Sequence, residues 1–412
     1  MTPRFQAPRG THDVLPAEQP AWQLVVGTLA EVAELYGYRR IQTPNFEDTE
    51  VFARTAGAGS DVVQKEMYTF EDRGGRSLTL KPEGTAPIAR AYIEHGMQRE
   101  PQPVKLYTVA PMYRYEAPQK GRYREHWQVS VEAFGSNDPG IDAEVIDLYR
   151  EVARRLGITR YVLQLNSIGD AACRPGYLER LNTWLDEHAE VLDDDARQKR
   201  ERSPLRVFDV KNEGVREALR DAPKITDHLC DACAEHFAAV RRVLDALGIE
   251  YELVPTLVRG LDYYTRTVFE FVNPEEKAQP QICSGGRYDG LVEALGGART
   301  PAVGFGAGIE RALIALEAEG RTAEPARLDV FVVADSDAPR ERVLRTLAEL
   351  RRAGLSADGD YAGRSVKGQM TQAGRTGART VVVVRGDDAA IRREGRDEQV
   401  VALDDVVATL VR

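Results

Sequence analysis

The chain has 412 residues, of which 42% are hydrophobic and 29% are charged, a composition typical of folded globular proteins and not of disordered ones. This length predicts about two to three domains, each able to bury its own core. The formal net charge of -10 argues against indiscriminate nucleic-acid binding, although it allows a local basic surface.

The cysteine content and the amino-terminal sequence indicate a cellular compartment. Four cysteines in a chain of this length give no disulfide framework and favour a reducing environment. The first ten residues, MTPRFQAPRG, lack the apolar stretch of a signal peptide, and we find no segment apolar enough to cross a bilayer. We therefore expect a cytoplasmic protein that does not enter a membrane.

The first 170 residues read as a mixture of strands and helices. Apolar residues at helical spacing predict a helix over 19–36, which ends at Gly37. Further strands are expected over 39–44, 78–80, 104–107, 109–115, 126–134 and 161–168, and helices over 85–95 and 142–156. The strands 109–115 and 126–134 enclose a charged loop, so its arginines and lysine would project from a stiff hairpin.

The pattern changes after this region. Residues 177–243 are charge-dense and mostly helical, which indicates an inserted module. Strands are expected again over 251–255 and 265–272, followed by a glycine-rich turn at 284–286 and a strand-to-helix passage over 302–316. A polar linker at 321–325 precedes a βαβαβ rhythm in which the apolar run 381–384 is typical of a buried parallel strand. The domains predicted are 1–170, 171–250, 251–322 and 327–412, in an overall α/β fold.

The most informative stretch is RGLDYYTRTVFEF, residues 259–271. Arg259 offers a forked cation, and Tyr263 and Tyr264 offer flat walls with hydroxyl groups, directly before residues that favour a strand. The alternative is a tyrosine-rich start of a strand that simply packs into the core.

Three further clusters shift the balance towards a binding site. In PEGTA (82–86), Glu83 could bind an ammonium group and Thr85 could cap a helix or touch a ligand. In the hairpin 113–132, Gln128, Ser130 and Glu132 share one face at period two, which is hard to explain as core packing. The alternative for PEGTA is a turn at the start of a helix. The alternative for the hairpin is a face of the sheet exposed to solvent.

The third cluster is VGFGAGIER, residues 303–311. Its glycines permit close backbone approach, and Arg311 follows at the start of a helix, where a cation opposes the helix dipole unless an anion is bound. Arg114, Arg259 and Arg311 together suit a nucleoside triphosphate. The sequence contains neither a GxxxxGK[ST] loop nor a Rossmann fingerprint after a strand, so we expect an ATP site of another kind, on an antiparallel sheet.

These motifs resemble a known family. RYEAPQKGRYREHWQ looks like motif 2, and GFGAGIER like motif 3, of the class II aminoacyl-tRNA synthetases. RGLDYYTRTVFEF and GGRYDGL (285–291) look like the histidine signatures of histidyl-tRNA synthetases, and RGTHDVLP (9–16) resembles their amino-terminal segment. The segment from the first helix through Thr43-Pro44 is similar to the dimer-forming motif 1.

The resemblance covers nearly the whole chain and implies a fold and an activity. It implies a class II catalytic core, with an antiparallel sheet and flanking helices, a helical insertion, and a carboxy-terminal α/β anticodon-binding domain. The activity would be ATP-dependent activation of L-histidine followed by its transfer to tRNA(His), by a homodimer, with Mg²⁺ bridging the phosphate oxygens.

The resemblance also assigns residues. Arg114 would hold the α-phosphate, Arg311 the γ-phosphate, and Arg259 the charge that develops in the transition state. Glu116 and Arg122 would complete the ATP site. The histidine site would comprise Glu83, Thr85, Arg114, Gln128, Glu132, Arg259, Tyr263, Tyr264 and Tyr288. Contacts with tRNA would come from Gln119, Lys120, Arg124, Arg364, Lys367 and Arg375.

Two questions stay open at this level. Cys230 and Cys233, flanked by His228 and His236, have zinc-like spacing, but a single CxxC favours reduced structural cysteines, and we assign no metal site. A histidine-sensing regulatory subunit of ATP phosphoribosyltransferase shares this fold, but such proteins lack the last domain and lose parts of the catalytic signatures, which this chain keeps. A module that senses uncharged tRNA beside a kinase is more remote, because we find no kinase segment.

Overall fold

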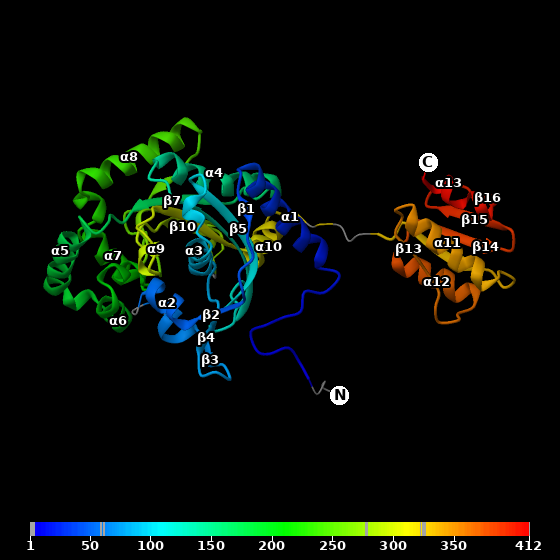
Figure 1. Ribbon diagram of the computed structural model, residues 1–412, viewed down its shortest axis with the longest axis horizontal. Helices are drawn as coiled ribbons and strands as arrows, with labels where there is room; N and C mark the ends of the chain where they lie inside the picture. Colours follow the sequence, from blue (N-terminus) through cyan, green and yellow to red (C-terminus); the bar gives the residue numbers. More distant parts are fainter. Residues whose placement is uncertain are drawn as a thin grey trace. The chain divides into compact units, whose positions relative to one another are not determined.

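The computed structural model describes residues 5–57, 60, 62–276, 279–321, 323 and 327–411. The chain forms two compact units, Met1–Ala323 and Glu324–Arg412 (Figure 1). Of the linker expected at 321–325, residues 322, 324 and 325 lie outside the described part of the chain.

A long, mostly antiparallel sheet organises the first unit. Its strand order is β1-β5-β6-β11-β10-β9-β7-β8, and only the outer pairs β1–β5 and β7–β8 are parallel among the described strands. The strands are β1 (Arg39–Arg40), β5 (Val104–Tyr113), β6 (Glu125–Phe134), β7 (Val162–Ser167), β8 (Glu252–Leu253), β9 (Thr265–Val272), β10 (Gln281–Arg287) and β11 (Ala302–Gly308).

Helices cover both faces of this sheet because its strands alternate between two apolar cores. The larger core joins one face to α1 (Gln19–Leu35), α4 (Pro139–Leu156), α8 (Asp231–Ala246) and α10 (Ile309–Ala318). On the opposite face, a smaller core holds α3 (Thr85–Glu94) and α9 (Leu291–Ala294). A three-stranded sheet, β2-β4-β3, lies next to α2 (Thr49–Ala56) in the chain and comprises β2 (Phe46–Asp48), β3 (Tyr68–Glu71) and β4 (Ser77–Leu80).

The inserted module has a core of its own. The chain enters it through α5 (Arg174–Glu187), continues through α6 (Asp194–Arg202) and α7 (Glu213–Ala218), and returns to the sheet through α8. Side chains of α5, α6 and α7 pack together in one cluster that includes the buried Tyr177 and Leu181. This helical region agrees with the charge-dense segment that the sequence indicated.

The second unit is a five-stranded sheet of order β13-β12-β14-β15-β16 with apolar clusters on both faces. Its elements are β12 (Val330–Ala334), α11 (Arg340–Arg352), β13 (Ala357–Gly359), α12 (Val366–Thr376), β14 (Thr380–Arg385), β15 (Asp388–Arg393), β16 (Gln399–Ala402) and α13 (Val406–Val411). The parallel pairing of β13, β12 and β14 confirms the predicted βαβαβ order. The antiparallel strands β15 and β16 extend it beyond the prediction.

Two predictions in the first unit are wrong. The strands expected over 104–107 and 109–115 form one strand, β5, because Thr108 continues the alternation and pairs with Ser130. The turn expected at 284–286 lies inside β10, where glycine serves close packing and not chain reversal. A β-carbon on Gly285 would lie 2.2 Å from the carbonyl oxygen of Gly304 on the neighbouring strand.

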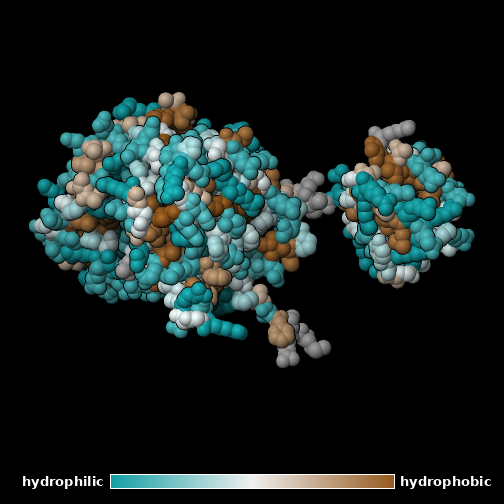
Figure 2. All heavy atoms as spheres, viewed as in Figure 1, coloured by the Kyte–Doolittle hydropathy of each residue, from teal (hydrophilic) through white to brown (hydrophobic). Residues whose placement is uncertain are grey.

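The surface is predominantly polar. In the face shown in Figure 2, hydrophilic residues cover most of each unit, and hydrophobic residues gather in smaller patches. Large exposed apolar side chains include Leu24 and Leu35 on α1 and Phe46 and Phe70 on the three-stranded sheet. Within the described residues, no helix combines the length and the apolar character that a membrane crossing requires.

Candidate active site

Strand β6 divides its side chains between a core and a site. Val129, Val131 and Ala133 point into the larger core. Because strand side chains alternate, His126, Gln128, Ser130 and Glu132 lie on the opposite face. The sequence therefore builds a polar surface on the side of the sheet where α3 lies.

Strand β11 makes room for these polar side chains. Gly304, Gly306 and Gly308 occupy alternate positions on the same face and pair with β6 in register. A β-carbon on Gly304 would lie 1.9 Å from an oxygen of Glu132, and one on Gly306 would lie 2.7 Å from Nε2 of Gln128. The glycines of GFGAG thus let the β6 side chains lie across the neighbouring strand.

A single cavity lies over this face. It contains about 890 Å³ of space between protein atoms, part of it open solvent. The predicted residues that line it are Glu83, Thr85, Arg114, Glu116, Arg122, Gln128, Arg259, Tyr263, Tyr264 and Arg311. Side chains more than two hundred residues apart in the chain therefore meet at one site.

Two buried carboxylates lie at one end of the cavity, Glu83 in its lining and Glu132 behind it. Glu83 accepts hydrogen bonds from the backbone N–H groups of Thr85 and Ala86, at 2.7 and 2.8 Å. The Thr85 hydroxyl donates to Oε1 of Glu132 at 2.7 Å, and the Tyr288 hydroxyl donates to Oε2. Burial raises the pKa of Glu83 and raises that of Glu132 well above its usual range. Such a pair favours a bound cation that would offset the charge of both acids.

Aromatic rings form a wall beside these acids. Tyr263 and Tyr264 lie 4.7 Å apart between centroids, and Tyr288 meets Tyr263 edge-on at 5.6 Å. Tyr263 and Tyr264 line the cavity, whereas Tyr288 and Glu132 lie behind it and are buried. Burial raises the pKa values of all three tyrosines, so their hydroxyl groups remain donors.

Four arginines converge on the rest of the cavity. Arg114 donates through Nε to the carbonyl oxygen of Pro82 at 2.8 Å. Arg311 donates to the carbonyl oxygens of Gly121 and Gln281 and to the side-chain oxygen of Gln279. Neutral acceptors hold these two guanidinium groups in place without neutralising their charge.

The electrostatics of these arginines favour an anionic ligand. Burial, together with the positive charges of Arg114, Arg122 and Arg259, lowers the pKa of Arg311 to about 10. Arg122 is paired with Glu116. Mutual repulsion of this kind is relieved when a polyanion with several phosphate groups binds between the guanidinium groups.

Arg259 lies between the acidic end and the arginine end. One terminal nitrogen pairs with Glu270 on β9, and the other donates to Oγ of Ser284 at 2.6 Å. Its Nε is buried and has no hydrogen-bond partner among the described residues. A buried donor without a hydrogen-bond partner lowers stability, unless a bound ligand accepts a hydrogen bond from it.

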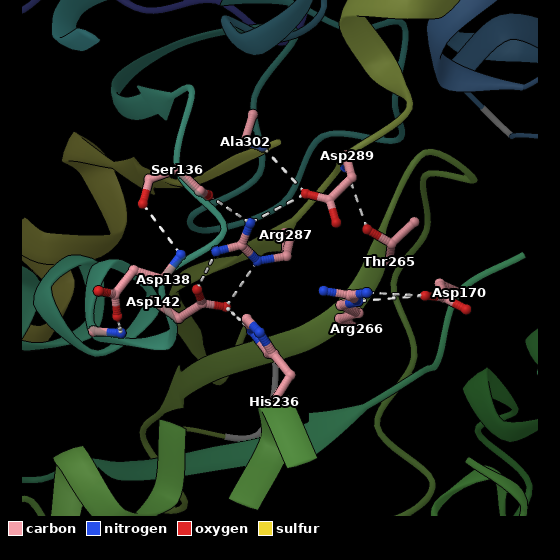
Figure 3. A network of polar contacts seen from close by, with 11 residues as sticks. Ser136, Asp138, Asp142, Asp170, His236, Thr265, Arg266, Arg287, Asp289 and Ala302 are labelled. Carbon is pink, nitrogen blue, oxygen red and sulfur yellow. Dashed lines mark hydrogen bonds and ion pairs between the residues drawn. The ribbon is translucent and has the colours of Figure 1, made fainter. Parts of the chain in front are cut away.

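A buried ionic network supports the strands beneath the site (Figure 3). Arg287, at the end of β10, is fully buried, pairs with Asp142 on α4 and donates to the carbonyl oxygen of Ser136 at 2.9 Å. His236 on α8 also contacts Asp142, at 3.3 Å. Asp289 links Arg287 to the backbone N–H of Ala302 on β11. These contacts tie β10 and β11 to the helices on the opposite face of the sheet.

The remaining predicted residues lie away from the cavity lining. Gln119 and Lys120 are exposed on the hairpin loop, and Arg124 stacks on Tyr115 with its guanidinium carbon 3.9 Å from the ring centroid. Arg364, Lys367 and Arg375 are exposed on the second unit, where Arg364 pairs with Asp360.

Several cavity residues were not singled out from the sequence. His126, Gln281, Ser284 and Glu310 all line the site. Burial, with Arg114 and Arg311 nearby, lowers the pKa of His126 to about 3, so this imidazole is neutral. The sequence signal for His126 was its position two residues before Gln128, which places both side chains on the same face of β6. Ser284 was hidden by the wrong prediction of a turn.

The arrangement can hold two ligand groups side by side. The acids and tyrosines suit an ammonium group with a polar ring, and the arginines suit a chain of phosphates. A carboxylate of the first ligand would then lie near the phosphates of the second, with Arg259 between them. Such a site suits phosphoryl or nucleotidyl transfer, in which positioning and charge stabilisation provide most of the catalysis.

Comparison with known proteins identifies the family of this chain. The family model described as histidyl-tRNA synthetase matches residues 10–312. The histidine–tRNA ligase of Moorella thermoacetica is 50% identical over 93% of this chain and 91% of its own length, and that of Syntrophomonas wolfei is 50% identical over 92% and 90%. The crystal structure of apo S. aureus histidyl-tRNA synthetase superimposes with a TM-score of 0.83 at 37% identity, covering 99% of this chain and all of that one. The chain belongs to the histidyl-tRNA synthetase family and has its class II fold.

Proposed function

We propose that this chain activates L-histidine with ATP and transfers it to tRNA(His). The observation that carries the proposal is the single cavity in which buried acids and tyrosines adjoin four arginines. The similarity to histidine–tRNA ligases over more than nine tenths of the chain supports the same reaction.

Histidine is the ligand that the acidic end would take. Its ammonium group would lie by Glu83 and Thr85, with Glu132 behind them, and Gln128 would contact the carboxylate. The imidazole would lie against the wall formed by Tyr263 and Tyr264, where hydroxyl groups can meet its ring nitrogens. A site built to hydrogen-bond a ring nitrogen leaves polar groups unpaired with a non-matching amino acid, a discrimination of ~10⁴-fold or more.

ATP would occupy the arginine end. Arg114 would hold the α-phosphate and Arg311 the γ-phosphate, with Arg122 and Glu116 beside them. A histidine carboxylate oxygen forms a bond to the α-phosphorus, and the bond from that phosphorus to the bridging oxygen breaks, so pyrophosphate leaves. Arg259 would stabilise the charge that develops on the α-phosphate, because its buried Nε lacks a partner beforehand.

The donor groups at this end also fit Mg²⁺. Glu116 and Glu310 line the cavity, and Mg²⁺ is commonly bound by one or two carboxylates together with substrate phosphates. When bound, the ion would neutralise negative charge on the phosphate oxygens.

The second step would bring tRNA to the same cavity. The 3′-terminal ribose hydroxyl attacks the carbonyl carbon of the adenylate, and AMP leaves. Gln119, Lys120 and Arg124 on the hairpin loop would meet the acceptor end. Arg364, Lys367 and Arg375 on the second unit would meet the anticodon, whose unpaired bases offer edges and faces to exposed side chains.

The assembly we propose is a homodimer in the cytoplasm. The segment similar to motif 1 lies beside exposed Phe46, which packs edge-on against Phe70, with their rings 6.3 Å apart. Apolar rings left at a surface are typical of subunit interfaces. Four cysteines without a disulfide agree with a reducing compartment. Sedimentation equilibrium would test the dimer, and a monomer at micromolar concentration would contradict it.

The decisive experiment is ATP–pyrophosphate exchange with each of the twenty amino acids, in the absence of tRNA. Exchange with histidine alone is the expected result. Exchange with a different amino acid would refute the assignment of the tyrosine wall. Histidine binding without exchange would instead favour a regulatory histidine sensor.

A truncation tests the role of the second unit and the domain division. Without residues 327–412, we expect histidine-dependent exchange to persist and charging of tRNA(His) to become poor. Full charging by the truncated protein would refute the assignment of this unit to anticodon binding.

A further inference from the structure

Three cysteines and one aspartate meet at the base of the helical insertion, outside the cavity described above. Asp170 and Cys173 lie in the loop after β7, Cys230 caps α8, and Cys233 lies in its first turn. One donor atom from each of the four residues lies within 4.8 Å of every other. The sequence pointed to the CxxC alone, and the fold adds two donors from almost sixty residues earlier.

We infer that Asp170, Cys173, Cys230 and Cys233 form a structural zinc site. Four donors, three of them sulfur, form the usual ligand number for structural zinc. A tetrahedral ion with ~2.3 Å bonds to sulfur and ~2.0–2.2 Å to oxygen separates its donors by roughly 3.5–3.8 Å. Sγ of Cys173 is already 3.9 Å from Oδ1 of Asp170, so modest movement of the other side chains closes the site.

The surroundings prepare the aspartate for this role. Arg266 donates to Oδ2 of Asp170 at 3.2 and 3.3 Å (Figure 3). Oδ1 accepts the backbone N–H of Ala172 at 3.0 Å and lies 3.9 Å from Sγ of Cys173. Partners that orient a ligand in this way are common around bound metals. The backbone N–H of Arg266 also donates to the carbonyl oxygen of Gly169 at 2.7 Å, although this arginine has a φ of 51° that non-glycine residues rarely adopt.

The loop backbone is shaped to bring the donors together. Gly169 has a φ of +61°, and a β-carbon there would lie 2.6 Å from Sγ of Cys173. Only glycine therefore allows this turn and this approach of the thiol. At α8, Cys230 is the N-cap residue and Cys233 lies in the first turn, so the partial positive charge of the helix end lies beside both residues.

Charge also balances for zinc. Binding releases three thiol protons to solvent, and three thiolates with one carboxylate around Zn²⁺ carry a net charge of -2. Arg266 supplies one compensating charge in direct contact with Asp170. Arg174, the next residue after Cys173, supplies a second and donates to the carbonyl oxygens of Gly169 and Tyr264 at 3.2 and 2.6 Å.

The two histidines near the CxxC do not belong to this site. His236 contacts Asp142 on α4 at 3.3 Å, and the ring of His228 lies 6.0 Å from that of Tyr177. The zinc would join the loop after β7, where the chain enters the insertion, to the start of α8, through which it returns to the large sheet. Its role would be to hold α5 and α8 in place, outside the reaction itself.

Metal analysis of the full-length protein tests the inference. Protein purified without chelator is expected to hold about one zinc per chain by plasma mass spectrometry, as four-donor structural sites do. Cys230→Ala should lose the zinc, and Cys283→Ala, at a buried cysteine on β10 outside the cluster, should keep it. Loss of zinc in both variants, or a different metal at that ratio, would overturn the assignment.

A reconstitution experiment tests the same inference on protein that has lost its metal during purification. Apo protein prepared under reducing conditions should bind Co²⁺ with the visible bands of a tetrahedral thiolate site, absent in Cys230→Ala and present in Cys283→Ala. Zinc should raise the thermal unfolding midpoint of the wild type but not of Cys230→Ala. Neither zinc in the purified protein nor a thiolate spectrum with Co²⁺ would overturn the inference. So would a thiol titration that finds two of the four cysteines joined as a disulfide.

Discussion

Replacing Arg259 with alanine should separate binding of histidine from its activation. The guanidinium is held by Glu270 and Ser284, and its remaining buried donor is free for a phosphate oxygen. At ~4 Å and an effective dielectric of ~20, one charge pair contributes about 4 kcal/mol. Loss of one donor to a developing oxyanion lowers kcat by ~10²–10³-fold. Because this charge develops in the transition state, we expect that loss in Arg259→Ala with histidine affinity changed by less than about threefold.

Two measurements and a control decide the outcome. ATP–pyrophosphate exchange gives kcat and KM, and calorimetry gives the dissociation constant for histidine. Ser284→Ala removes a neutral partner of Arg259 and keeps the guanidinium, so it should lower kcat by less than ~10-fold, as expected for one hydrogen bond of ~1 kcal/mol. Equal losses in histidine affinity and kcat for Arg259→Ala would mean that the arginine is a ground-state anchor, and the reasoning would fail.

Three further predictions concern the framework of the site. Gly304→Ala places a β-carbon 1.9 Å from a β6 carboxylate oxygen and should destabilise the first unit by ~1–3 kcal/mol, whereas Gly27→Ala, with open space in mid-helix, should be neutral or stabilising in urea unfolding. Burial raises the pKa of Glu310 from 4.5 to about 7, so its contribution to stability is complete below pH ~4.5 and is lost as the pH rises to about 7. Glu310→Gln should remove up to about 3 kcal/mol of that pH dependence, and an unchanged profile would contradict the shift. Arg287→Met leaves Asp142 buried without this partner and should cost ~3–5 kcal/mol, while the additional change Asp142→Leu should restore much of the loss; no recovery would refute a simple ion-pair role.

The sequence carried the local chemistry of this protein. The period-two pattern of β6 separates Val129 and Val131 from Gln128 and Glu132, and this alternation survives in the fold because a strand has two faces. The motifs around Arg114, Arg259 and Arg311 could also be identified from the sequence, because each is a short continuous segment with its own turn or strand. The βαβαβ order of the second unit could be predicted as well, because each of its strands and helices has a local sequence pattern.

Only the tertiary structure decided which of these groups meet. The segment Ser284–Gly286 reads as a turn, but the packing of β10 between β9 and β11 requires its two glycines inside a strand. Glu132 and Tyr288 lie behind the cavity and not in its wall, a distinction of depth that no spacing along the chain encodes. Asp170 and Cys173 join the CxxC only because the helical insertion returns to its starting point. Periodicity reports which face of an element is buried, whereas contacts between distant segments depend on how the elements pack.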